Sequence, residues 1–208
     1  MRDDAAVTSW ALAARDGDPA AVEEFVRATR PDVRRYVAHL SGDPQAVDDL
    51  VQDAYLRALR SLPRFEGRSS ARTWLLVIAR RVVADRIRWL TTRPRISGTD
   101  DWQAAAERNQ PRDVPGFEES VALRELLAAL PGPRREAFVL TQLLGLTYPE
   151  AAIVARCPVG TIRSRVARAR ETLITQLTSE EPQPVDPEPA AAGRTDAPRS
   201  PAVVTAVA

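Results

Sequence analysis

The feature that most constrains this fold is a series of apolar residues at helical spacing, with glycine scarce inside the periodic segments. The alternating β-branched residues that would indicate strands are absent. Asp18-Pro19 and Asp43-Pro44 each place a capping carboxylate before a proline that suits a first helical turn. The sequence therefore predicts an all-α protein, with its first helices over residues 20–30, 32–40, 44–62 and 71–90.

Proline and glycine also divide the chain into two small helical domains. Residues 93–116 lack periodicity and are expected to form a flexible linker. Helices are expected to resume at residue 117, to break at Pro131-Gly132-Pro133, and to continue to about residue 178. Residues 1–7 and the proline-rich residues 179–208 are expected to be disordered. The predicted domains are therefore residues 8–92 and residues 117–178.

Composition excludes several classes of function. Cys157 is the only cysteine and His39 is the only histidine, so the chain forms no internal disulfide and no Cys/His metal cluster. No paired carboxylates mark a catalytic pocket, so we expect neither an enzyme such as a nuclease nor a cofactor or metal site. A long apolar run is missing and the N-terminus carries acids, which disfavours a membrane span or a signal peptide. We expect a soluble cytoplasmic protein with no membrane partner.

Residues 148–170 have the layout of a helix-turn-helix. Thr147 and Glu150 have capping-box spacing and open a short helix, and Pro158 ends a tight turn and begins a longer helix. Apolar residues recur along this second helix at helical spacing, and they are Ile162, Val166, Ala169 and Leu173. The arginines fall off that stripe, and they are Arg163, Arg165, Arg168 and Arg170. The second domain is therefore predicted to be a helix-turn-helix domain.

Each of these arginines is able to reach a phosphate or to fork onto a guanine edge. Small residues at the start of the helix favour a close approach to a DNA backbone, and they are Gly160, Thr161 and Ser164. The alternative is a solvated basic face on an ordinary helix pair. DNA binding is favoured, and a stand-alone helix-turn-helix regulator fits this part of the chain equally well.

The helix predicted over residues 44–62 carries an acidic face. Asp49, Asp53 and Arg57 are four residues apart and share one side of the helix, away from its apolar stripe. One interpretation is a binding face for a basic partner. The other is a solvated face with a single ion pair, worth at most about 0.5 kcal/mol. From these residues alone both interpretations stay open.

The loop over residues 65–70 and the helix after it combine arginine, small polar residues and aromatic residues. The helix begins with a nearly continuous apolar run from Trp74 to Ala79, which predicts burial, and then becomes basic. Arginine neutralises phosphates and aromatic rings stack on unpaired bases, so this segment suits single-stranded DNA.

Four stretches in this order resemble the extracytoplasmic-function (ECF) sigma factors of bacterial RNA polymerase. They are "DDLVQDAYLRALR", "FEGRSSARTWLLVIARRVVADRIR", "LRELLAALPGPRREAFVLTQLLGLTYPEAA" and "CPVGTIRSRVARARETL". The likeness runs from about residue 8 to residue 178, and within the family it is strongest to the actinobacterial sigma factor C group. It implies a factor that binds RNA polymerase core, recognises −10 and −35 promoter elements and promotes transcription initiation at a specific set of promoters.

The resemblance assigns partners to the segments described above. The acidic helix would dock on the clamp coiled coil of the largest polymerase subunit, and the second domain would meet the flap of the second subunit. The core-binding residues that it implies are Asp48, Asp49, Leu50, Gln52, Asp53, Leu56 and Arg57. The resemblance leaves open whether an anti-sigma factor also binds this chain.

Two sets of residues would then contact promoter DNA. The first set would bind the melted, single-stranded −10 element, and the second would bind the duplex −35 element. Those implied for the melted −10 element are Phe65, Arg68, Ser69, Ser70, Arg80, Arg81, Asp85 and Arg88. Those implied for the −35 duplex are Pro158, Gly160, Thr161, Arg163, Ser164, Arg165 and Arg168. Arg81 departs from the pattern, since many family members have Asn at that position. The change retains phosphate binding but alters the base edge that this position is able to read.

Overall fold

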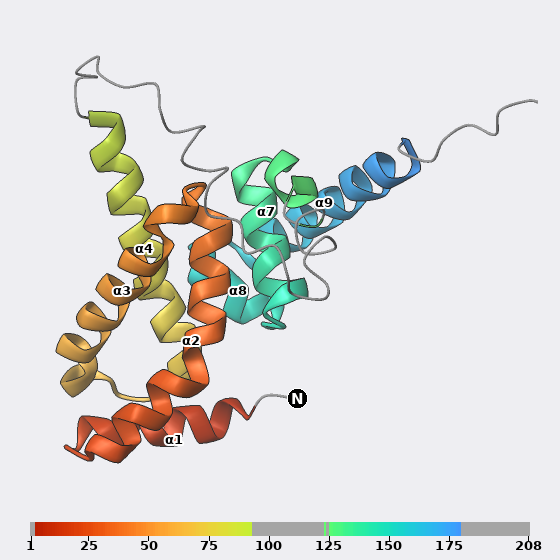
Figure 1. Cartoon of the computed structure of the whole chain (residues 1–208). Coiled ribbons are helices and arrows are strands. Elements are labelled where there is room, and N and C mark those ends of the chain that lie inside the picture. The colour runs from red at the N-terminus through yellow and green to blue at the C-terminus, as the bar shows by residue number, and fades with distance from the viewer. Residues whose placement is uncertain (1–2, 93–122, 124, 180–208) are drawn as a thin grey trace, which may run out of the picture.

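The computed structural model describes residues 3–92, 123 and 125–179, and all secondary structure in these ranges is helical (Figure 1). This confirms the all-α prediction. The predicted linker and C-terminal tail lie outside the described residues, apart from Ser179, which closes the last helix. The α-helices with described bounds are α1 (Asp4–Arg15), α2 (Pro19–Ser41), α3 (Val47–Ser61), α4 (Ala71–Thr92), α7 (Gly132–Phe138), α8 (Tyr148–Ala155) and α9 (Val159–Ser179), and residues 125–129 are also helical. Short 3-10 turns at Pro44–Ala46 and Leu62–Arg64 flank α3, and a π-helical turn at Val139–Leu143 extends α7.

The N-terminal segment is a helix, so the expected disorder of residues 1–7 is wrong from Asp4 onward. The Asp3 carboxylate accepts hydrogen bonds from the backbone N–H groups of Ala5 and Ala6, at 3.1 and 3.0 Å. These bonds satisfy N–H groups that a helix start otherwise leaves unpaired. Val7 and Ala11 are buried against the rest of the domain. Packing of this apolar face therefore orders a segment that was expected to be disordered.

Helix α2 is continuous across the position where two helices were predicted. Pro31 lies inside it, although a proline in a helix interior removes one hydrogen bond and costs about 3 kcal/mol. Phe25 and Val33, on either side of Pro31, are 0% and 1% exposed. Burial of side chains on both sides of the proline outweighs that local cost. The helix ends at Gly42, which adopts a left-handed conformation with φ of 67°.

Helices α1 to α4 enclose the core of the first domain, with α1 lying across one end of α2 (Figure 1). The apolar stripe predicted for α3 is confirmed, because its members are all buried: Val47, Leu50, Val51, Ala54, Ala58 and Leu62. The Tyr55 hydroxyl lies 2.7 Å from the Thr29 hydroxyl within this core. Burial raises the pKa of Tyr55 to about 12.

The second domain contains the predicted helix-turn-helix. The capping box is present, since Glu150 N–H donates to the Thr147 hydroxyl while Thr147 N–H donates to the Glu150 carboxylate. The predicted apolar stripe of α9 is buried, and it consists of Ile162, Val166, Ala169 and Leu173. Arg156 in the turn has φ of 52°, a left-handed conformation that costs a non-glycine residue about 1–2 kcal/mol.

The two domains pack against each other through one shared hydrophobic core. Helix α8 lies against α4, and buried residues of α8 belong to the same cluster as those of α2, α3 and α4 (Figure 1). Polar contacts cross the same boundary. The Tyr36 hydroxyl of α2 donates to the Glu136 carboxylate of α7 at 2.8 Å. The described structure is therefore a closed arrangement of the two domains.

Candidate nucleic-acid and protein interfaces

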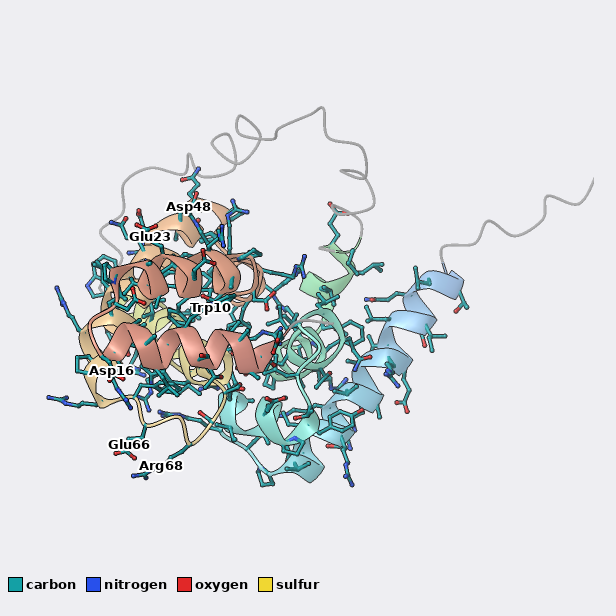
Figure 2. The ribbon with its side chains drawn as sticks, turned by 90° about the horizontal axis from the view of Figure 1, so that it is seen from below. Trp10, Asp16, Glu23, Asp48, Glu66 and Arg68 are labelled. Carbon is teal, nitrogen blue, oxygen red and sulfur yellow. The ribbon has the colours of Figure 1, made fainter. Side chains whose placement is uncertain are left out.

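The acidic face of α3 is open to solvent on the side of the molecule that Asp48 marks in Figure 2. Asp48, Asp49 and Gln52 are exposed, and Leu56 is 46% exposed beside them. An exposed leucine among acids suits a partner that is basic with an apolar centre. Leu50, by contrast, is 7% exposed and belongs to the domain core. Leu50 thus supports the helix and is not part of its exposed face.

Arg57 connects α3 to α4. Its guanidinium lies 3.0 Å from the Asp53 carboxylate and 2.8 Å from the Asp85 carboxylate. The hydrogen bond to Asp85, with smaller effects of Asp53, raises the pKa of Arg57. Asp85 also lies 3.4 Å from Arg88. Two residues assigned to different partners, Arg57 to polymerase and Asp85 to DNA, are therefore joined to each other.

The loop before α4 is anchored by an aromatic pair. Phe65 is 4% exposed, and its ring centroid lies 4.9 Å from that of Trp74. Phe65 therefore anchors the loop and offers no open face for stacking on a base in this arrangement. Arg68 is exposed and pairs with Glu66, and Figure 2 shows both beside α1, on the opposite side of that helix from Asp48. Ser69 and Ser70 are partly buried at the end of the loop.

Some arginines of α4 are exposed to solvent, and Arg80 is paired with a residue of the second domain. Arg81 and Arg88 are exposed. The Nε of Arg80 instead donates to Glu136 at 2.6 Å, to the same carboxylate oxygen that accepts from Tyr36. Burial lowers the pKa of Arg80, but the hydrogen bond and charge of Glu136 raise it further, so the net shift is upward. Burial and the Glu136 charge hold the pKa of Tyr36 well above its usual value.

Arg72 is a structurally central residue that sequence reasoning missed. It is 6% exposed, and its Nε donates to the Asp32 carboxylate at 2.6 Å. Its Nη2 donates to the Leu144 carbonyl of the second domain, and its Nη1 lies 3.6 Å from Asp4 of α1. The signal in the sequence was a charged residue beside the apolar run that begins α4. Because a buried arginine requires hydrogen-bond acceptors, this position could have predicted a buried carboxylate partner.

The helix-turn-helix presents its basic face outward. Arg163, Ser164 and Arg168 are exposed on α9, as are Pro158 and Gly160 at its start. Thr161 and Arg165 are partly buried, and Arg165 lies 3.6 Å from the Cys157 sulfur. Arg170 donates to the Gln142 side chain at 2.7 Å. The structure therefore brings the predicted −35 residues together on one exposed surface.

Family comparisons agree with this division into two domains. Residues 25–91 match Sigma-70 region 2, and residues 120–173 match Sigma-70, region 4. The chain is 52% identical over 172 residues to the "Probable RNA polymerase sigma-C factor" of Mycobacterium bovis (strain ATCC BAA-935 / AF2122/97), covering 83% of this chain and 91% of that protein. The ECF sigma-E factor of Escherichia coli (strain K12) is 37% identical over 153 residues, which cover 68% of this chain and 76% of that protein.

The chain belongs to the ECF sigma factors of bacterial RNA polymerase. It is a promoter-recognising transcription initiation factor, not an enzyme, and its partners are RNA polymerase and promoter DNA. In the described ranges, none of the helices has both the length and the apolar character needed to cross a membrane.

Two solved structures share this fold. CnrH in complex with the cytosolic domain of CnrY has a TM-score of 0.65 and 24% identity, covering 84% of this chain and 99% of that chain. The sigma factor RpoE of Bartonella quintana, in complex with the anti-sigma factor NepR, has a TM-score of 0.59 and 24% identity, covering 76% of this chain and 97% of that chain.

Proposed function

We propose that the exposed acidic face of α3 is the surface that docks on polymerase core in the cytoplasm. The clamp coiled coil of the largest subunit is the expected partner, with the flap of the second subunit meeting the second domain. The observation that carries the proposal is the combination of exposed acids with the exposed Leu56 on one helix face. Charge attraction steers the encounter and the apolar contact adds affinity.

The second domain would hold the −35 element through α9. Arg163 and Arg168 lie on its exposed face, and Gly160 leaves the N-terminal end of the helix accessible. Arginine side chains in a major groove fork onto guanine or contact phosphates, and a helix N-terminus favours a nearby phosphate. Arg165 lies against Cys157 and is a better candidate for a phosphate at the edge of the contact than for a base.

The loop and α4 would hold the melted −10 strand. Arg68, Arg81 and Arg88 are exposed along this surface, whereas Arg80 pairs with Glu136 of the second domain. Ser70 also lies 3.5 Å from Glu150 of α8. For Arg80 and Ser70 to contact DNA, the second domain has to move away from α4. We propose that polymerase core, which spaces the two domains along a promoter, stabilises this open arrangement.

Run-off transcription with core polymerase tests the polymerase contact. Asp49→Arg places a like charge against the basic partner and is expected to lower the run-off product at least about tenfold. The matched control is Asp16→Arg, an equal change of charge at the exposed end of α1 that breaks only a solvent-exposed pair with Arg15, so the run-off product should stay within about twofold. Retention of full core binding and promoter-specific initiation by Asp49→Arg would show that this face does not dock on polymerase.

A further inference from the structure

A small cavity lies at the boundary between the two domains, where the last turn of α2, the middle of α4 and the start of α7 supply its walls. Its volume is about 270 Å³. Sites for drug-sized ligands have volumes of about 300–1,000 Å³, so this cavity suits only a small molecule. Because its walls belong to both domains, the cavity is complete only in the closed arrangement. Its apolar lining consists of Leu40, Val83, Ala84, Ile87 and Pro133.

Arg135 brings to this cavity a positive charge that no carboxylate compensates. The residue is half-buried, and its two Nη groups donate to the backbone carbonyls of His39 and Leu130, at 3.4 and 3.2 Å. Among the described residues, no carboxylate lies within ion-pair distance of the guanidinium, and its Nε is buried without an acceptor. A partly buried cation with only neutral partners favours a bound anion.

The other two charged groups of the lining, Arg80 and Glu136, are paired with each other. The Arg80 Nε donates to the Glu136 carboxylate at 2.6 Å, and the Tyr36 hydroxyl donates to the same oxygen. The charge of Glu136 is therefore compensated by Arg80, and the charge of Arg135 is left over. Each Nη group of an arginine carries two hydrogens. Since the bonds to the two carbonyls use one hydrogen from each group, Arg135 retains donors for an anion in the cavity.

We propose that this cavity binds a small carboxylic acid with an apolar body, in its ionised form. The carboxylate pairs with Arg135, and the apolar body lies against Leu40, Val83 and Ile87. A ligand held between the domains stabilises the closed arrangement, in which Arg80 is withdrawn from the −10 strand. This consequence rests on the function proposed above for α4, whereas the site itself does not.

The only histidine of the chain gives a direct readout of the site. His39 lines the cavity, so the NMR signals of its imidazole report an occupant. The probes are benzoate, benzamide, which has the same ring without the charge, and acetate, which has the charge without the ring. All three are titrated at one fixed pH, since the imidazole itself titrates. Benzoate should give a saturable shift with a Kd of a few millimolar, at least about fivefold tighter than either of the other probes. Equal binding of the three probes, or no saturable shift with benzoate, would overturn the proposal.

Arg135→Gln and Arg134→Gln form a matched pair of variants. The two arginines are neighbours in α7 and both are half-buried, but Arg135 lines the cavity and Arg134 does not. Arg135→Gln should weaken benzoate binding at least about fivefold and leave benzamide binding unchanged, whereas Arg134→Gln should leave both within about twofold. If Arg135→Gln weakened benzoate and benzamide equally, the arginine would only support the shape of the cavity. If Arg134→Gln weakened benzoate as much, the effect would be one of general charge.

A substitution that fills the cavity locates the ligand without altering any charge. Ala84 is half-buried in the wall that α4 supplies. Ala84→Leu should abolish the saturable His39 shift with benzoate. A shift that survives in this variant would show that benzoate binds elsewhere.

DNA titrations on the free protein test the effect on domain closure. A ligand that binds only the closed arrangement favours it about elevenfold at ten times its Kd. At that concentration, benzoate should weaken binding of single-stranded −10 DNA about tenfold and leave binding of duplex −35 DNA within about twofold. Acetate at the same concentration controls for ionic strength.

The two measurements separate failure of the site from failure of the function proposed for α4. A saturable His39 shift without weaker single-strand binding would overturn the role of the ligand in closure. If the free protein bound no single-stranded −10 DNA even without benzoate, the function proposed for α4 would be contradicted, and the role in closure with it. The His39 titration would still decide whether the site exists.

Discussion

The two surfaces proposed to bind DNA, on α4 and on α9, differ in how accessible they are. The face of α9 with Arg163 and Arg168 is exposed, whereas Arg80 on α4 is held by Glu136 of the opposite domain. The same domain that presents one surface covers part of the other. Under the proposed assignment, duplex recognition at −35 requires no rearrangement of this closed structure, but full contact of α4 with a melted −10 strand requires the domains to separate.

The charged contacts at and beside the boundary between the two domains differ in how deeply they are buried. Within the first domain, Arg72 and Asp32 form a buried pair at 2.6 Å, with side chains 7% and 1% exposed, and Arg72 also donates to the Leu144 carbonyl of the second domain. Removing one member of a buried pair leaves an uncompensated charge and costs about 3–5 kcal/mol. Glu136 is less enclosed, and Glu150 lies at the edge of the boundary. Substitution of Asp32 should therefore destabilise the first domain itself, whereas substitutions of Glu136 and Glu150 act on the boundary between the domains.

Asp32→Ala is expected to have the largest effect. It leaves the Arg72 guanidinium buried without its carboxylate, and the free energy of unfolding should fall by about 3–5 kcal/mol in urea titrations. Asp53→Ala removes a carboxylate from the exposed pair with Arg57 and should cost less than about 1 kcal/mol. Equal losses for the two variants would show that the Arg72–Asp32 pair is not buried in solution.

Glu136→Ala is expected to open the molecule while each domain stays folded. The Tyr36 hydroxyl and Arg80 lose their shared acceptor, which should shift the closed–open equilibrium by about 1–3 kcal/mol. Fluorescence energy transfer between a label on exposed Glu23 of α2 and one on exposed Glu171 of α9 measures the separation, with both positions changed to cysteine in a Cys157→Ala background. An unchanged transfer efficiency would show that Glu136 does not hold the domains together.

Glu150→Gln should have the smallest effect, and that effect depends on pH. Burial alone would raise the pKa of Glu150, but hydrogen bonds from Thr147 and the charge of Arg72 hold this pKa below the usual 4.5 of a glutamate. The ionised carboxylate therefore stabilises the fold above pH 4.5, and this contribution is lost as the pH falls through the lower folded pKa. The variant should be about 1 kcal/mol less stable at pH 6.5, a difference that shrinks toward pH 3. A difference that stays constant across this range would contradict the assignment.

Features set by a few neighbouring residues were predictable from the sequence. The buried stripe of α3 follows from apolar spacing, and the capping box follows from Thr147 and Glu150. In the same way, the spacing of arginines against the apolar stripe placed Arg163 and Arg168 on the open side of α9. Local pattern sets which face of a helix is apolar, and the core then selects that face.

Features that depend on distant partners were not predictable in this way. Helix α1 and the continuity of α2 at Pro31 both depend on burial against other helices. The Arg72–Asp32 pair joins residues 40 positions apart, and the Tyr36–Glu136 contact joins residues 100 positions apart. No local spacing encodes such pairs, so both the buried ion pair of the first domain and the packing of one domain on the other were missed. Phe65 was assigned to DNA for the same reason, since its partner Trp74 became evident only in the fold.

The most direct test of this account is a pair of DNA titrations on the free protein, with and without Glu136→Ala. One probe is duplex −35 DNA and the other is single-stranded −10 DNA, at one fixed salt concentration, since binding of both depends on salt. Glu136→Ala is expected to strengthen binding of the single strand at least about fivefold and to leave duplex binding within about twofold. An equal change for both probes, or no change for the single strand, would contradict the claim that one domain covers the −10 surface of the other.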